Sequence, residues 1–150
     1  MAITLRHMKH FMHILNFWLY FHLIFPDPYV KVSLCHSEKT VKTRKTSIRK
    51  NTIDPVFNET LSFNLTPDML DDCSLVVTVW DYNSKSRDDT VGRIVLGKNP
   101  SGQEEKNHWS SMLYCPRSAV AHWHMLQPCP EIEEKSSSCG PSIQSEYSSA

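Results

Sequence analysis

Short apolar stretches recur along the middle of this chain, and turn-forming residues separate them. The most apolar stretch runs from Leu75 to Trp80 and predicts a central strand. Pairs such as Asp54-Pro55 and Asn83-Ser84 mark turns. Further strands are predicted in residues 30–34, 40–48, 57–65, 91–96 and 120–126. Strands this short at this spacing predict an all-β, antiparallel β-sandwich.

One stretch breaks the strand pattern near the end of the predicted domain. Residues 103–113 predict a short helix that presents Trp109, Met112 and Leu113 to the core. The last predicted strand follows this helix. Within it, we expect Trp123 and Leu126 to be core anchors.

The composition divides the chain into three regions. Residues 1–25 are apolar and rich in histidine, residues 26–127 carry the strand pattern, and residues 128–150 are rich in Ser and Pro. The last region has too few apolar residues to bury, so we expect a disordered tail. The chain holds 16 basic and 16 acidic residues, so electrostatic binding must depend on a local patch.

A series of motifs in the middle region resembles the synaptotagmin family, and its ending resembles the second of the two C2 domains in these proteins. In chain order the motifs are DPYVKV (27–32), KTRKT (42–46), NTIDPVFNE (51–59), VWDY (79–82), DTVG (89–92), HW (108–109), ML (112–113), PR (116–117) and WHML (123–126). The resemblance implies a C2-type β-sandwich that lacks its first two strands, with a short helix before the last strand.

Residues 1–25 show neither the alternation nor the motifs of the two missing strands, and three interpretations remain open. The first is a short membrane anchor, although the apolar part, residues 11–25, is shorter than the roughly 20 residues that span a bilayer. The second is a strand or helix that packs over the edge left by the missing strands. The third is a start that does not belong to the fold. If the segment did insert, the basic residues after it would place the β domain in the cytoplasm.

The resemblance also implies a calcium site formed by loop aspartates. By position, the family ligands correspond to Asp27, Asp81 and Asp89, with Asn83 in place of a further aspartate, and one ligand of the first loop has no counterpart. Calcium affinity depends on the number of charged oxygen ligands. We therefore expect weak calcium binding at most, or a loop in which these residues only form turns. The cysteines show no CxxC spacing, which argues against a zinc site, and we expect no other cofactor.

A run of basic residues without any acid among them is the main candidate binding site. It consists of Lys39, Lys42, Arg44, Lys45, Arg49 and Lys50. Alternation along a strand sends Lys42 and Arg44 to one face and Lys45 to the other. The run resembles the polybasic strand with which the family binds phosphatidylserine, phosphoinositides and SNARE proteins. The alternative is a charged edge strand that only prevents aggregation.

These features predict a non-enzymatic module of membrane traffic and exocytosis that binds anionic phospholipids without needing calcium. The chain has no GxSxG motif, no Gly-rich phosphate loop and no HRD segment, which argues against an enzyme. The alternatives are a scaffold that binds SNARE proteins or other C2 domains, and a weak calcium-dependent phospholipid sensor. We expect no nucleic-acid partner, and a peripheral location on the cytoplasmic face of a vesicle or the plasma membrane.

Overall fold

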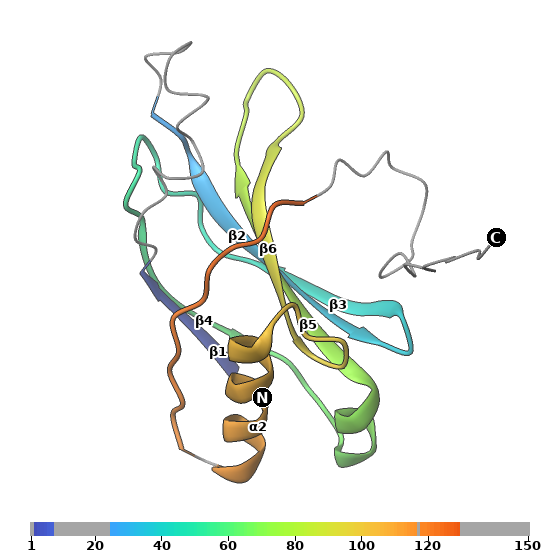
Figure 1. Ribbon diagram of the computed structural model, residues 1–150. Coiled ribbons are helices and arrows are strands. Elements are labelled where there is room, and N and C mark those ends of the chain that lie inside the picture. The colour runs from blue at the N-terminus through green and yellow to red at the C-terminus, as the bar shows by residue number, and fades with distance from the viewer. Residues whose placement is uncertain (1, 8–24, 117, 130–150) are drawn as a thin grey trace, which may run out of the picture.

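Two antiparallel sheets form the layers of the fold (Figure 1). The computed structural model describes residues 2–7, 25–116 and 118–129. The strands are β1 (Ala2–His7), β2 (Pro28–His36), β3 (Lys39–Lys45), β4 (Val56–Ser62), β5 (Cys73–Asp81) and β6 (Asp89–Gly97). The helices are the 3₁₀ helix η1 (Pro67–Asp72) and the α-helix α2 (Gln103–Tyr114). The expected all-β antiparallel fold with one short α-helix is therefore confirmed.

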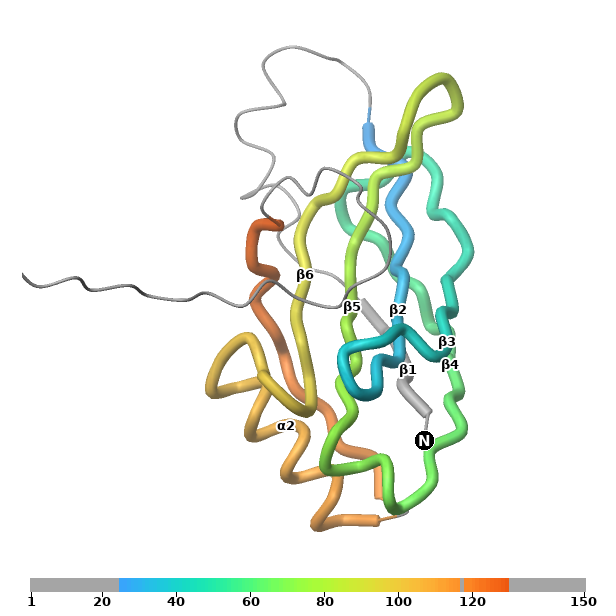
Figure 2. Tube along the Cα trace, turned by 90° about the vertical axis from the view of Figure 1, so that its right-hand side faces the viewer, coloured from blue at the N-terminus to red at the C-terminus, as the bar shows by residue number. Residues whose placement is uncertain are grey.

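The larger sheet has the strand order β3-β2-β5-β6, and the smaller sheet consists of β1 and β4. β5 lies between β2 and β6, and none of its residues is exposed, which fits its almost continuous apolar sequence. Helix α2 packs at the β6 side of the larger sheet, and β3 lies at the opposite side (Figure 2). The basic strand and the helix thus occupy opposite edges of one sheet.

The hydrophobic core lies between the two sheets and is closed by α2. Its members alternate along each strand, as expected for strands with one buried face. They include Val30, Val32 and Leu34 of β2, Leu75, Val77 and Val79 of β5, Ile94 and Leu96 of β6, Phe57 and Leu61 of β4, Phe63 just after β4, and Trp109 of α2. The prediction that Trp109 and Met112 face the core is confirmed, whereas Leu113 is exposed.

The hairpin between β2 and β3 contains an irregularity on its outer strand. Ser37 and Glu38 form the turn with positive φ angles of 47° and 65°, the conformation that suits a tight hairpin. The register then shifts, since Leu34 pairs with Lys42 but Cys35 pairs with Thr40. Val41 is left without a partner on β2 and forms a β-bulge.

The prediction of a final strand at residues 120–126 is wrong. Residues 119–126 have no regular secondary structure, and only Gln127 forms an isolated bridge, with Arg93 of β6. Trp123 is 67% exposed and is not a core anchor, whereas Leu126 packs partly against the core. The alternation of His and apolar residues was misleading because residues 119–126 pair with no strand, and His124 contacts side chains of α2 instead.

Strand β1 lies inside the segment for which the sequence left three interpretations open. It pairs antiparallel with β4, from Ala2 opposite Ser62 to His7 opposite Val56. Residues 2–7 thus form a strand on the edge of β4, the kind of packing that the second interpretation described, and for the segment as a whole the three interpretations stay open. The apolar stretch from residue 11 to residue 24 and the tail from residue 130 onward lie outside the described residues. Of the helices in the described part of the chain, none has the length and apolar character needed to cross a membrane.

Candidate functional site: the basic edge strand and the adjoining loops

Strand β3 presents its basic side chains on both faces of the sheet edge. Lys42 and Arg44 lie opposite the buried residues Leu34 and Val32, so they share the face that carries the core. Lys45 lies opposite Lys31 and points to the other face. Every residue of β3 is exposed. The basic residues of β3 therefore form a charged strip along the edge of the sheet, beside the core.

Two of these cations make contacts that fix their position. Arg44 donates a hydrogen bond from Nε to the carbonyl oxygen of Ser62, just where β4 ends, at 2.7 Å. The Lys45 ammonium lies 5.2 Å from the centre of the Tyr29 ring, within the range of a cation–π contact. Lys39 and Lys42 form no ion pair with any described residue. These two charges remain available for a ligand.

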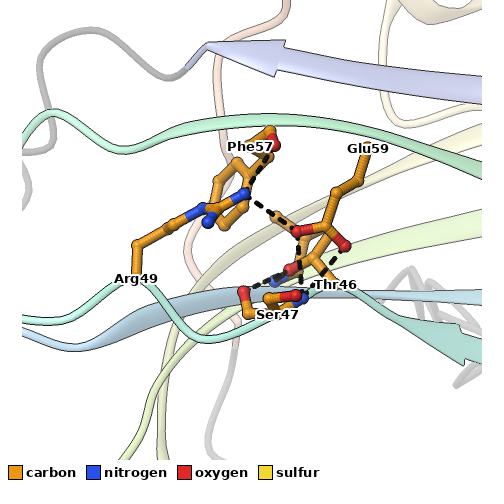
Figure 3. A network of polar contacts seen from close by, with 6 residues as sticks. Thr46, Ser47, Arg49, Phe57 and Glu59 are labelled. Atoms are coloured by element: carbon orange, nitrogen blue, oxygen red, sulfur yellow. Dashed lines mark hydrogen bonds and ion pairs between the residues drawn. The ribbon is translucent and has the colours of Figure 1, made fainter.

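Arg49 has a structural role instead, because it connects the loop after β3 to strand β4 (Figure 3). Its Nη2 donates to the carbonyl oxygen of Phe57 at 2.6 Å and to Oε1 of Glu59 at 3.0 Å. The amide of Ser47 donates to both carboxylate oxygens of Glu59, at 3.2 and 3.1 Å. The Nε atom of Arg49 is buried without a partner in the described part of the chain. A guanidinium held in this way is unavailable to a lipid headgroup.

The hydroxyl of Thr46 anchors the other end of this loop. It accepts a hydrogen bond from the Val30 amide at 3.0 Å and donates one to the Ser47 carbonyl at 3.1 Å. Thr46 is buried. The chain therefore leaves the basic strand along a fixed path between β2 and β4.

Replacing Glu59 with Ala is expected to lower the free energy of unfolding by about 1–3 kcal/mol, because the Ser47 amide and the Arg49 guanidinium each lose an acceptor. We expect no larger loss of stability, because the Arg49 and Glu59 side chains are 36% and 26% exposed and solvent weakens an ion pair between partly exposed groups. Urea unfolding followed by circular dichroism measures the effect. Glu38→Ala, in the exposed β2–β3 turn, is the control and should change stability by less than about 0.5 kcal/mol. Equal midpoints for both variants would contradict the structural role of Glu59.

The predicted calcium ligands Asp27 and Asp81 are close together but already engaged. Asp27 accepts from the Lys50 ammonium at 2.6 Å and from the Asn51 amide at 2.8 Å. Its own amide donates to Oδ1 of Asp81 at 2.8 Å. Burial would raise the pKa of Asp27, but the hydrogen bonds from Lys50 and Asn51 outweigh it and hold the pKa below its usual value. Burial raises the pKa of Asp81, and the neighbouring aspartates add to the rise.

The remaining predicted ligands lie on the β5–β6 loop. The side-chain oxygen of Asn83 accepts from the amides of Lys85 and Ser86, at 3.0 and 3.2 Å, so it forms a turn, as the alternative interpretation proposed. Asp89 is exposed and lies opposite Asp81 in the β5–β6 register. The structure thus brings Asp27, Asp81 and Asp89 to one end of the sheet, with Asn83 turned into its own loop.

Asp88 is part of this end of the molecule although the sequence did not single it out. It accepts a hydrogen bond from the Tyr29 hydroxyl at 2.8 Å and another from the Asn83 amide at 3.0 Å. Burial, followed by the hydrogen bond and charge of Asp88, raises the pKa of Tyr29 to about 12. Tyr29 and Asp88 are far apart in the chain, so only the three-dimensional structure could reveal the pair.

The loop residues do not fit a calcium ion in this arrangement. Calcium takes six to eight oxygen ligands, whereas here the oxygens of Asp27 and Asn83 accept hydrogen bonds from protein donors. The ammonium of Lys50 also lies 2.6 Å from Asp27 and 4.5 Å from the centre of the Tyr82 ring. Within the described ranges, no group of three or more His, Cys, Asp or Glu residues is arranged to hold a metal ion.

Comparison of the sequence with known proteins finds similarity to one domain family. The family model described as "C2 domain" matches residues 12–112. Synaptotagmin-1 of Aplysia californica is 45% identical over 105 residues, which are 70% of this chain and 24% of that protein. Human synaptotagmin-2 is 40% identical over 107 residues, which are 71% of this chain and 25% of that protein. The chain thus spans about a quarter of the length of these relatives.

Two solved structures were also found to be similar to this chain. The C2A domain of plant Extended Synaptotagmin 1 is 20% identical, covers 64% of this chain and 65% of that chain, and has a TM-score of 0.46. The RIM C2A domain from Drosophila is 28% identical, covers 49% of this chain and 59% of that chain, and has a TM-score of 0.44. The family match extends over more than half of the sequence, and the chain belongs to the C2 domain family.

Proposed function

We propose that this chain is a non-enzymatic module of membrane traffic that docks on anionic phospholipids through the basic edge strand β3. The observation that carries the proposal is the exposure of Lys39, Lys42 and Arg44 on one strand, without an acidic side chain paired to them in the described part of the chain. Each basic residue near an anionic leaflet contributes about 1 kcal/mol. Three such residues give reversible binding whose strength follows the surface charge of the membrane.

Of the six basic residues that the sequence suggested as a binding site, some already make contacts within the protein. Arg49 is committed to Glu59 and Phe57, and Lys50 is committed to Asp27. Lys45 points to the opposite face of the sheet, beside Tyr29. We assign headgroup binding to Lys39, Lys42 and Arg44, and a supporting role to Arg49 and Lys50.

Calcium independence is the second part of the proposal. The ammonium of Lys50 lies 2.6 Å from Asp27. This contact and the hydrogen bond from the Asp27 amide to Asp81 support the proposal, because both engage carboxylates that a calcium ion would need as ligands. A peripheral position on the cytoplasmic face of a vesicle or plasma membrane, where anionic lipids are exposed, follows from the same proposal.

The double variant Lys42→Ala/Arg44→Ala tests the proposal by co-sedimentation with phosphatidylcholine vesicles that contain an increasing share of phosphatidylserine. Loss of about 2 kcal/mol corresponds to a roughly 30-fold rise in Kd. Lys85→Ala/Lys106→Ala changes the net charge equally, on the β5–β6 loop and α2, and should bind nearly as well as the wild type. Binding should be the same with calcium and with a chelator.

Three results would count against the proposal. If both double variants lost affinity equally, only the net charge would matter and β3 would not be the site. If calcium strengthened binding strongly, the loops would act as a calcium sensor. If vesicle binding did not change but capture of SNARE proteins or of another C2 domain was lost, the strand would serve the alternative function of a protein scaffold.

A further inference from the structure

A chain of hydrogen bonds through two histidines joins helix α2 to the segment after it. Glu105 and His108 lie on α2, and His124 lies in the irregular segment 118–127. Nδ1 of His124 is 2.7 Å from Oε1 of Glu105, and Nε2 of His124 is 2.7 Å from Nδ1 of His108. The side chains of Glu105 and His124 are only 6% and 12% exposed. A buried carboxylate thus begins a chain of two imidazole rings.

A third imidazole and a second carboxylate surround this chain. The ring of His122 stacks on that of His108, with centroids 4.7 Å apart and planes 19° apart. Nδ1 of His122 is 3.9 Å from Oε2 of Glu104. The His108 and His124 rings are themselves nearly parallel, at 16°. Strand β6 also packs against α2, but in the described part of the chain it brings no further titratable side chain to His108.

The two short contacts limit how many protons the chain can hold. When both imidazoles are neutral, His124 can donate from Nδ1 to Glu105 while its Nε2 accepts from Nδ1 of His108. One further proton can be placed on Nε2 of His108 without breaking either bond. A second one cannot, because two N–H groups would then face each other across 2.7 Å. Full protonation of the rings is incompatible with the closed arrangement.

Further contacts also hold the segment, among them a backbone hydrogen bond between Val120 and the His108 ring. Arg93 and Gln127 exchange two backbone hydrogen bonds, at 2.9 and 3.0 Å, and the Gln127 side chain donates to the Ser101 carbonyl at 2.8 Å. Leu126 packs partly against the core. Before Leu126, the segment carries the exposed side chains of Trp123 and Met125. The histidine chain is thus a buried side-chain attachment of this segment to α2.

We propose that Glu105, His124 and His108 form a pH-sensitive clasp, which holds residues 118–127 against helix α2 at neutral pH and releases them in mild acid. The direction of this pH response follows from the surroundings of the His108 ring. Burial lowers the pKa of His108 below its usual 6.5, and the nearby His124 and His122 lower it further. The closed state therefore binds fewer protons than the open state. The stability of the clasp is complete above pH 6.5 and is lost as the pH falls below it.

Hydrogen exchange of the full chain, measured at several pH values and corrected for intrinsic exchange rates, tests the clasp. In the wild type, exchange of the Arg93 and Gln127 amides, whose hydrogen bonds join the segment to β6, should increase by up to about tenfold for each pH unit below 6.5, while β5 stays protected. In His108→Gln, the amide can donate to or accept from His124, so this increase should be lost. His36→Gln, at the end of β2, removes a histidine elsewhere and should behave as the wild type.

Two results would overturn the clasp. The first is the same pH dependence in the wild type and in His108→Gln. The second is release of residues 118–127 only together with global unfolding. Should His108→Gln fail to fold, nuclear magnetic resonance titration of the wild-type imidazoles decides the matter. A His108 ring that titrates at or above pH 6.5 in the folded chain would contradict the proposal.

Discussion

Removal of strand β1 is expected to lower the free energy of unfolding by about 3–5 kcal/mol, at a net value near 1 kcal/mol for each backbone hydrogen bond. β1 pairs with β4 along nearly its whole length, and its loss would expose the edge of β4 to water. β4 also carries Glu59, which holds Arg49, and ends at Ser62, which holds Arg44. Loss of β1 should therefore weaken binding to anionic vesicles as well as stability.

Urea unfolding of the full chain measures this effect, beside a variant in which residues 2–7 are replaced by alternating Gly and Ser. This replacement keeps the length of the segment and removes its strand propensity. A deletion of residues 2–7 should give the same loss of stability if pairing is the cause. An unchanged midpoint in both variants would show that β4 does not depend on β1.

Replacing Leu75 with Ala is expected to destabilise the domain by about 2–5 kcal/mol, the range for a buried Leu whose site cannot collapse around the cavity. Leu75 is completely buried in β5, where it lies between Leu34 of β2 and Leu96 of β6. Since β2 and β5 are the inner strands of the larger sheet, the site has little freedom to relax.

The measurement is chemical denaturation at neutral pH. The dependence of the free energy of unfolding on denaturant concentration should be the same in the variant and the wild type. Val56→Ala, on the exposed face of β4, is the control because Val56 is 49% exposed. It should change stability by less than about 0.5 kcal/mol. A loss of similar size in both variants would mean that the core is not organised around β5.

Local patterns were sufficient to predict the central strands. The run from Leu75 to Trp80 predicted β5 because none of its residues is exposed, and such a strand is visible in the sequence as an apolar run. The positions of Lys42 and Arg44 on one face and of Lys45 on the other also follow from strand alternation. Helix α2 was predicted within one residue of its observed end, since the strand pattern stops there.

Contacts between distant residues could not be predicted in the same way. The sequence gives no sign that Arg49 reaches Glu59 or that Tyr29 reaches Asp88, because such pairs depend on how the sheets are placed. Residues 120–126 were mistaken for a strand because their apolar and polar residues alternate. In the fold they have no neighbouring strand to pair with before Gln127, and this information is not local.

The β-bulge at Val41 has a consequence for the behaviour of the domain on a crowded surface. Proteins bound to a bilayer are concentrated in two dimensions, where exposed strand edges on neighbouring molecules meet often. β3 is the outer strand of its sheet, but the bulge interrupts its hydrogen-bonding register, and its lysines repel an identical edge. We therefore expect that the strand proposed to bind lipid also keeps neighbouring copies from joining edge to edge.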